Sequence, residues 1–168
     1  MKKRIDDAVI RDFVDGDSEE LKALWRAAGL GNYPNHPDQD LENIRATGAG
    51  RIFVMERDGQ LVATATAAMD GHRGWIYYVA VAPEYQRQGL GRRIIEYAES
   101  WLMSAGVPKV LLLVRDTNSA VADFYEALGY VREPCFVMGR WLRCPDADEA
   151  VASKTDGAAV AAPERRAG

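Results

Sequence analysis

The sequence predicts an α/β protein of one domain, and three observations lead to that class. Apolar and polar residues alternate over 8–14, as in a half-buried strand. The segment 51–71 reads as two strands joined at Asp58-Gly59, a pair typical of tight hairpin turns. A strand–helix–strand order follows over 75–115, and such a unit makes its two strands parallel. We therefore expect a mixed sheet, antiparallel in its first half and flanked by helices.

Two helices are expected before the hairpin. In the segment 15–29, apolar residues recur at the i, i+3, i+4 and i+7 spacing that gives a helix one buried face. These residues are Leu21, Leu24, Trp25 and Ala28. Asp17 or Ser18 can cap this helix, and Gly29 ends it. Glycine, asparagine and proline make 30–37 a loop, and a second short helix is expected at 38–48.

The second half of the chain alternates strands with helices. A strand over 74–82 is stopped by a proline, and apolar residues at helical spacing predict a helix at 89–104. The continuously apolar segment 109–115 indicates a strand buried on both faces. A helix is expected at 118–129, and one or two last strands at 130–142.

Composition and charge narrow the classes of function. The 168-residue chain has a formal net charge of −4, which argues against nonspecific binding to nucleic acid. No apolar run reaches the roughly 18 residues of a membrane span, and no signal-peptide segment follows the basic start. Cys135 and Cys144 form no CxxC motif, and the two histidines show no metal-ligand spacing. We expect a cytoplasmic, metal-free protein with a domain over 1–144 and a disordered, alanine- and charge-rich tail over 145–168.

The segment "EYQRQGLGRR" at 84–93 lies between a strand and a helix. Bare glycine backbone and positive charge at a helix start favour phosphate binding, because the first N–H groups are unpaired. A P-loop needs a lysine followed by serine or threonine, where this chain has Arg92 and Arg93. A dinucleotide fingerprint needs a third glycine, where this chain has Ile94. A third pattern, Gln/Arg-x-x-Gly-x-Gly/Ala, is satisfied over 86–91.

With this pattern, residues 75–130 resemble the core of the GNAT superfamily of acyl-CoA-dependent N-acetyltransferases. The resemblance runs from "VAVAPEYQRQGLGRRII" to "NSAVADFYEALGY". It implies the GNAT fold, in which a mixed and mostly antiparallel sheet is splayed between its fourth and fifth strands and flanked by helices. The segment "DGHRGWIYY" also resembles the YpeA-like bacterial branch.

The resemblance implies a binding site for acetyl-CoA as acyl donor, without a metal. The pantetheine arm would pair with the backbone of Val79, Ala80 and Val81, and the N–H of Val79 would stabilise the oxyanion. The residues implied to hold the pyrophosphate are Arg87, Gln88, Gly89, Leu90, Gly91 and Arg92. Asn118 would bond the pantetheine while capping its helix, and Tyr125 would protonate the leaving thiolate as general acid.

The general base and the acceptor site stay open. Many relatives carry a glutamate on the central strand, where this chain has Tyr77. Other candidate bases are Glu56, Asp70, His72 and Glu133, beside a water chain or no dedicated base. Three acids of the second helix either attract a cationic amine or are ordinary acids favoured by the helix dipole, namely Asp38, Asp40 and Glu42. The polar turn at 70–74 either faces the acceptor or is a plain hairpin loop.

The leading hypothesis is an acyltransferase that moves the acetyl group of acetyl-CoA to a primary amine of a small molecule or a protein by direct attack. A second hypothesis is a non-catalytic acyl-CoA-binding sensor or interaction module, because the strand carboxylate is missing. A third is a nucleotide-binding module. We expect an amine acceptor as partner, with no nucleic acid and no membrane, and homodimer formation is left open.

Overall fold

The computed structural model describes residues 7–31, 36–140 and 142, and its α/β architecture confirms the predicted class. One five-stranded sheet has the order β1-β2-β3-β4-β5. Its strands are β1 (Val9–Asp12), β2 (Gly50–Arg57), β3 (Gln60–Met69), β4 (Gly74–Val81) and β5 (Val110–Leu111). Neighbouring strands are antiparallel except β4 and β5, which are parallel. The tail expected at 145–168 and Cys144 lie outside the described residues.

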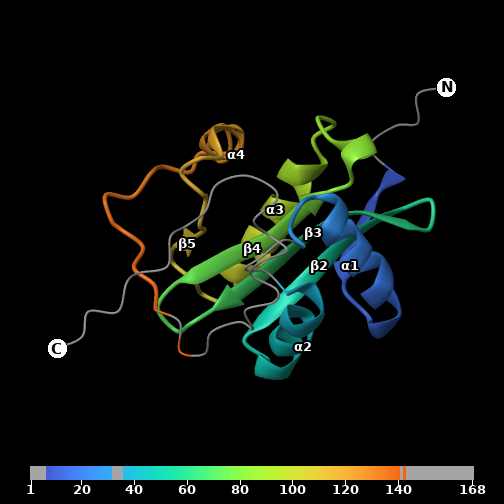
Figure 1. The fold of residues 1–168 in the computed structure, drawn as a ribbon, viewed down its shortest axis with the longest axis horizontal. Helices are drawn as coiled ribbons and strands as arrows, with labels where there is room; N and C mark the ends of the chain where they lie inside the picture. Colours follow the sequence, from blue (N-terminus) through green and yellow to red (C-terminus); the bar gives the residue numbers. More distant parts are fainter. Residues whose placement is uncertain (1–6, 32–35, 141, 143–168) are drawn as a thin grey trace, which may run out of the picture.

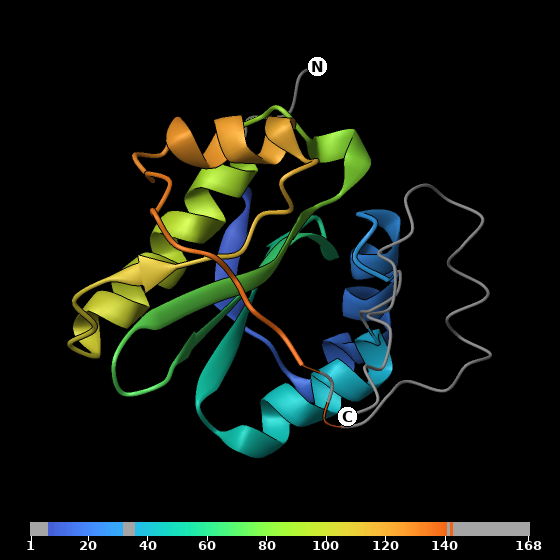
Figure 2. The ribbon, with the colours of Figure 1, turned by 60° about the vertical axis from the view of Figure 1, so that its left-hand side comes forward.

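Helices cover both faces of the sheet (Figures 1 and 2). The helices are α1 (Ser18–Ala27), α2 (Pro37–Thr47), α3 (Leu90–Ser104) and α4 (Ser119–Glu126), with short 3-10 turns η2 (Asp15–Asp17) and η3 (Pro83–Tyr85). One hydrophobic core lies between the sheet and α3 with α4, and a second lies between the sheet and α1 with α2. The two faces of the sheet therefore pack against different pairs of helices.

The local patterns of the sequence are confirmed in the helices and in the first hairpin. Buried residues at the predicted spacing are Leu21, Leu24 and Trp25 in α1, and Leu90, Ile94, Ala98 and Leu102 in α3. The β2–β3 turn has positive φ angles at both Asp58 (52°) and Gly59 (76°). Such a turn matches the right-handed twist of the two strands that it joins.

β4 carries a bulge. The register between β3 and β4 shifts after the pair Thr66–Tyr77, so that Tyr78 and Val79 together stand opposite one residue of β3. Tyr78 has a left-handed φ of 50°, which is uncommon for a residue with a side chain. Side chains alternate along a regular strand, but here both Tyr77 and Tyr78 lie on the α1/α2 face.

The fifth strand is much shorter than predicted. β5 pairs with β4 through only two residue pairs, the first of them at Gly74, and then the two strands part. The expectation of a strand over 109–115 buried on both faces was wrong, since Leu113 is 68% exposed. A segment that has parted from its neighbour has a core on one side and solvent on the other. This parting is the splay that the family resemblance implied.

Among the described residues, 131–140 form no strand, so the prediction of one or two last strands was wrong. Their side chains are exposed, with Phe136 at 97% and Met138 at 93%. Apolar content predicted the strands, but a strand also needs a neighbour to accept its backbone hydrogen bonds. Pro134 cannot donate to such a ladder.

Gly74 occupies a place where packing leaves no room for a side chain. A Cβ there would lie 2.9 Å from Val107 Cγ1 and 3.1 Å from Leu102 Cδ1. We expect Gly74→Ala to lower the free energy of unfolding by about 1–3 kcal/mol, the usual cost of overpacking. Gly16→Ala is the control, because a Cβ at Gly16 meets nothing within 4 Å. Urea unfolding measures both, and equal stability of the two variants would contradict the prediction.

Candidate functional site

The turn between β4 and α3 leaves the start of a long helix open. Arg87 and Gly89 both have left-handed backbone, with φ of 59° and 82°. Gly89 is the N-cap residue of the 15-residue α3, and it has no side chain that could bind the first N–H groups of the helix. The first turn of α3 contains no acidic residue. Unpaired N–H groups and the positive end of a helix dipole bind anions. The turn therefore suits a group such as a phosphate.

The two glycines of the turn are required for different reasons. A Cβ on Gly89 would meet nothing within 4 Å, so this backbone is open to a ligand. A Cβ on Gly91 would lie 3.2 Å from Phe124 Cζ and 3.6 Å from Val81 Cγ2. Gly91 thus lets α4 pack closely against the start of α3 and the end of β4. The sequence pattern predicted an approach to phosphate at both glycines and did not show this packing.

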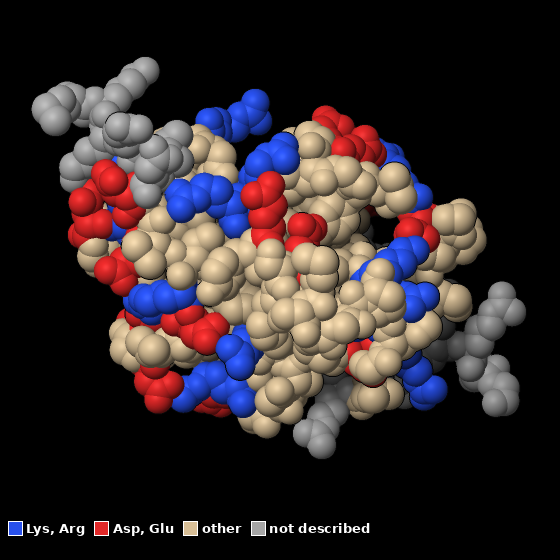
Figure 3. Space-filling model, turned by 180° about the vertical axis from the view of Figure 1, so that it is seen from behind, with Lys and Arg blue, Asp and Glu red and all other residues tan. Residues whose placement is uncertain are grey.

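Two polar side chains of the turn form hydrogen bonds within the protein. Arg92 donates to the carbonyl of Ala127 at 3.3 Å, and Gln88 donates to that of Glu84 at 3.1 Å. Arg87 is exposed beside Gly89. On the face seen in Figure 3, the described basic residues are interspersed with acids and form no extended basic area. On that face, positive charge is therefore local.

The bulge leaves part of the backbone of β4 outside the regular ladder. Val79 has no Cα partner in β3. No strand of the described part of the chain pairs with the other edge of β4 beyond Trp75. Val79 and Val81 pack toward the α3-side core, whereas Ala80 is buried on the α1/α2 side. The stretch from Val79 to Val81 thus offers an open edge next to the turn.

The two predicted site residues of α4 have different surroundings. Asn118 caps the helix, because its Oδ1 accepts from the N–H of Val121 at 3.2 Å. Its side-chain NH₂ remains a donor. Tyr125 is 8% exposed, and its ring packs edge-on against Phe124 and Tyr130. Burial raises the pKa of Tyr125 to about 12, so the hydroxyl keeps its proton at neutral pH.

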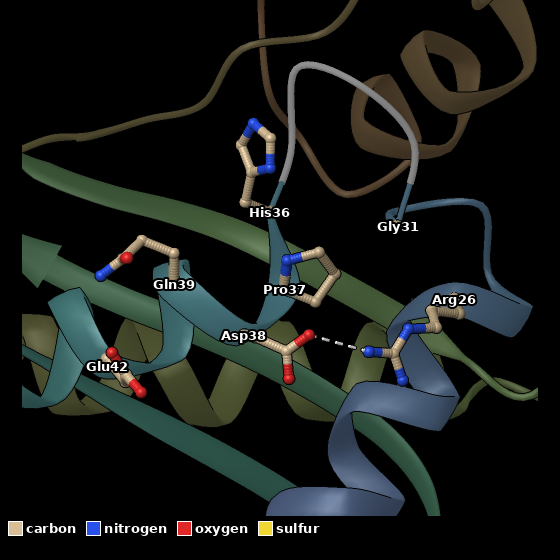
Figure 4. Close-up of a pocket in the computed structure, with 7 residues that line it drawn as sticks. All are labelled: Arg26, Gly31, His36, Pro37, Asp38, Gln39 and Glu42. Atoms are coloured by element: carbon tan, nitrogen blue, oxygen red, sulfur yellow. Dashed lines mark hydrogen bonds and ion pairs between the residues drawn. The ribbon is translucent and has the colours of Figure 1, made fainter. Parts of the chain in front are cut away.

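A cleft of about 570 Å³ lies where the end of α1 meets the start of α2 (Figure 4). It is lined by Arg26, Gly31, His36, Pro37, Asp38, Gln39 and Glu42. Asp38 pairs with Lys22 at 2.8 Å and with Arg26 at 3.1 Å, and Lys22 above all holds the pKa of Asp38 below its usual value. Of the three acids for which the sequence left attraction of a cationic acceptor open, Asp38 is therefore already neutralised by the protein.

Asp40 turns away from that cleft and toward β4. The Tyr78 hydroxyl donates to Asp40 Oδ2 at 2.5 Å. Burial, and then Asp40, raise the pKa of Tyr78 above its ordinary value. Sequence reasoning missed this pair, because a regular strand would place Tyr77 and Tyr78 on opposite faces. Only the bulge brings Tyr78 to α2.

The candidate bases have partners elsewhere. Glu56 pairs with Arg11 at 2.8 Å and Glu133 pairs with Lys109 at 2.7 Å. Asp70 and the exposed His72 belong to the β3–β4 turn, at the end of β4 opposite Gly89. Asp70 accepts from three donors within that turn and at its edge. The turn at 70–74 is thus built as a hairpin loop.

The fold and the turn define the class, an acyltransferase built on a splayed mixed sheet. Residues 18–130 match the model of the acetyltransferase (GNAT) family, and the chain belongs to this family. An acetyltransferase of Pectobacterium atrosepticum is 34% identical over 133 residues, which cover 79% of this chain and 94% of that protein. An acetyltransferase of Yersinia pseudotuberculosis matches to the same extent. The protein is therefore an enzyme of acetyl transfer.

Solved structures support the same fold. The ribosomal-protein-S18-alanine N-acetyltransferase of Escherichia coli has a TM-score of 0.64 and 27% identity, over 73% of this chain and 76% of that one. The glucosamine-6-phosphate N-acetyltransferase of Arabidopsis thaliana has a TM-score of 0.62 and 22% identity, over 81% and 99%. An aminoglycoside N-acetyltransferase in complex with CoA has a TM-score of 0.69 and 18% identity, over 81% and 95%.

The described residues contain neither a candidate membrane span nor a candidate metal site. No helix in that part of the chain is long and apolar enough to cross a membrane. Within the same residues, no group of three or more His, Cys, Asp or Glu side chains is placed to hold a metal ion.

Asp70 should stabilise the fold without serving the reaction. Its carboxylate accepts from the N–H groups of Arg73 (2.6 Å) and His72 (2.8 Å) and from Trp75 Nε1 (2.9 Å), which together lower its pKa to about 2. Since the folded-state pKa lies below the unfolded one, this stability is present above about pH 4 and is lost as pH falls toward about 2. We expect Asp70→Asn to lower the melting temperature at pH 7 and to flatten that acid loss. Calorimetry tests both, and a lower kcat in a folded Asp70→Asn variant would contradict the assignment.

Proposed function

We propose that the protein transfers the acetyl group of acetyl-CoA to a primary amine of a small molecule or a protein by direct attack. The carrying observation is that the open helix start at Gly89 and the bulge at Tyr78 lie in one continuous stretch of chain. An anion-binding turn thus adjoins an open strand edge. A cofactor with a pyrophosphate and an amide-bearing arm can use both.

Acetyl-CoA would be held mostly by backbone groups. The pyrophosphate would accept from the first N–H groups of α3, with Arg87 and Arg92 adding charge; the remaining residues of this turn are Gln88, Gly89, Leu90 and Gly91. The pantetheine amides would pair with the edge formed by Val79, Ala80 and Val81, as an added strand does. Asn118 would donate through its NH₂, because its Oδ1 caps α4.

The chemical step would use one backbone donor and one side-chain donor. As the amine nitrogen attacks the thioester carbon, the N–H of Val79 would stabilise the oxyanion. The carbon–sulfur bond then breaks, Tyr125 would give its proton to the thiolate, and the proton released by the attacking nitrogen would return to the tyrosine through water. With a pKa of about 12, the phenol of Tyr125 is protonated at neutral pH.

An amine acceptor is supported by the family and by the similar structures. Their names include a sugar-phosphate amine, an aminoglycoside and an alanine of a ribosomal protein. The fold therefore serves amines of both small molecules and proteins.

Gly89→Glu tests the donor site. The substitution places a side chain and a negative charge where the pyrophosphate would bind, so we expect CoA binding to be abolished in calorimetry. Gly106→Glu is the matched control, because Gly106 ends the same helix with a similar φ of 79° and has open space around it. CoA affinity like that of the native protein in a folded Gly89→Glu variant would reject the site.

Tyr125→Phe tests the general acid. The ring and its packing are kept, and only the proton donor is removed. We expect kcat to fall at least about tenfold, the low end of general acid catalysis, with the acetyl-CoA Kd and the melting temperature nearly unchanged. Tyr130→Phe is the control, since it removes a neighbouring hydroxyl that donates to Glu99. Native turnover by Tyr125→Phe when chemistry limits the rate would make Tyr125 a core residue.

A further inference from the structure

Asp40 is a half-buried acid that pairs with no cation of the described residues. Its neighbours on the same side are paired, Asp38 with Lys22 and Asp15 with Arg45. Asp40 accepts from Tyr78 (2.5 Å) and from the N–H of His36 (3.0 Å), and both bonds end on Oδ2. Among the described residues, no Lys or Arg pairs with Asp40 and no donor reaches its Oδ1. Removing a carboxylate from water without a positive partner costs free energy. A cationic ligand that binds Oδ1 would offset part of that cost.

Aromatic rings stand beside this carboxylate. The ring of Tyr78 lies 4.1 Å from that of Trp25 and 6.3 Å from that of Tyr77, measured between centroids. Burial first, and then the charge of Asp40, raise the pKa of Tyr77, so its hydroxyl also lies within the field of the carboxylate. Tyr77 is 37% exposed. A carboxylate near the accessible ring of Tyr77 is an environment that ammonium groups prefer.

Unpartnered polar atoms lie beneath the same two tyrosines. Trp25 Nε1 and Thr66 Oγ1 are fully buried and have no hydrogen-bond partner. Trp25 stacks on Tyr78, and Thr66 is the β3 partner of Tyr77. Buried polar atoms in proteins are nearly always paired. Like Thr64 Oγ1, which is also buried without a partner, these atoms are sealed in the core, so a ligand at this surface would contact Asp40 and Tyr77.

The patch lies on the face opposite the donor site. α3 and α4 cover the face where acetyl-CoA would bind, and Asp40 lies on the α1/α2 face. Tyr78 precedes Val79, whose N–H would hold the oxyanion, and a whole tyrosine side chain separates that backbone from Asp40. A group bound at Asp40 is therefore not the attacking nitrogen but lies further along the acceptor.

We propose that Asp40, oriented by Tyr78, binds a second positive group of the acceptor, so that the enzyme prefers amines that carry an additional ammonium. This inference rests on the proposed function. Asp40 is thus a specificity residue: it selects the acceptor by charge, and the reacting atoms do not touch it. Tyr78 is a positioning residue, because its hydroxyl occupies Oδ2 and leaves Oδ1 for the ligand.

The test compares α,ω-diaminoalkanes with n-alkylamines of the same length. Binding to the CoA-saturated protein is followed by NMR through the indole N–H of Trp25, which needs no turnover. We expect at least one diamine to bind about tenfold or more tightly than its monoamine. Asp40→Asn should remove this preference, Tyr78→Phe should reduce it, and Glu19→Gln, which alters an exposed acid of α1, should keep it. Turnover of the same amines should show the preference in KM rather than kcat.

The outcomes separate this inference from the proposed function. Failure of CoA to bind, or absence of any acetyl transfer, would reject the proposed function, and amine binding could still be measured on the free protein. Equal binding of diamines and monoamines to the native protein would overturn the role of Asp40, even with acetyl transfer intact. A preference that survives in a folded Asp40→Asn variant would overturn it as well. A loss of kcat for monoamines in that variant would make Asp40 a base instead, and would also reject the inference.

Discussion

The bulge of β4 at Tyr78 is the constraint on which the rest of the site depends. One extra residue, held at a positive φ, interrupts the ladder with β3. Conformations of this kind cost free energy and persist only when the surroundings hold them. Here Tyr78 is held by Trp25 on one side and by Asp40 on the other. The core under α1 and α2 thus keeps the strand in the shape that opens its far edge.

The proposed donor and acceptor sites lie on opposite faces of the sheet. The open start of α3 and the edge at Val79 belong to the face covered by α3 and α4. The Asp40–Tyr78 pair belongs to the other face. In the proposed arrangement, donor and acceptor would approach one thioester from opposite sides without competing for the same surface. A change at Tyr78 would disturb both, because its backbone shapes the donor edge and its side chain orients Asp40.

Much of the fold could be predicted from short-range patterns, and the misses have a common cause. Helical spacing and the Asp58-Gly59 turn depend on neighbours in sequence, and both predictions are confirmed. The strands expected at 109–115 and 130–142 depend on a partner strand, which periodicity does not reveal. At the candidate site, the glycine turn could be predicted from the sequence, because the positive φ at position 89 favours glycine. The Asp40–Tyr78 pair could not, because a bulge changes which residues share a face.

This contrast follows from the kinds of contact that each half of the site would make. Donor contacts would come from backbone N–H groups, so they constrain conformation and leave a recognisable glycine pattern. Acceptor contacts would come from side chains on α1, α2 and β4, which can change without altering the backbone. Asp38 and Asp40 illustrate why the acceptor contacts could not be predicted from the sequence. They lie two residues apart on one helix, yet Asp38 is neutralised by Lys22, whereas Oδ1 of Asp40 accepts from no donor of the described residues. What distinguishes them is the residue each one faces across the α1/α2 layer, and that is fixed by tertiary packing alone.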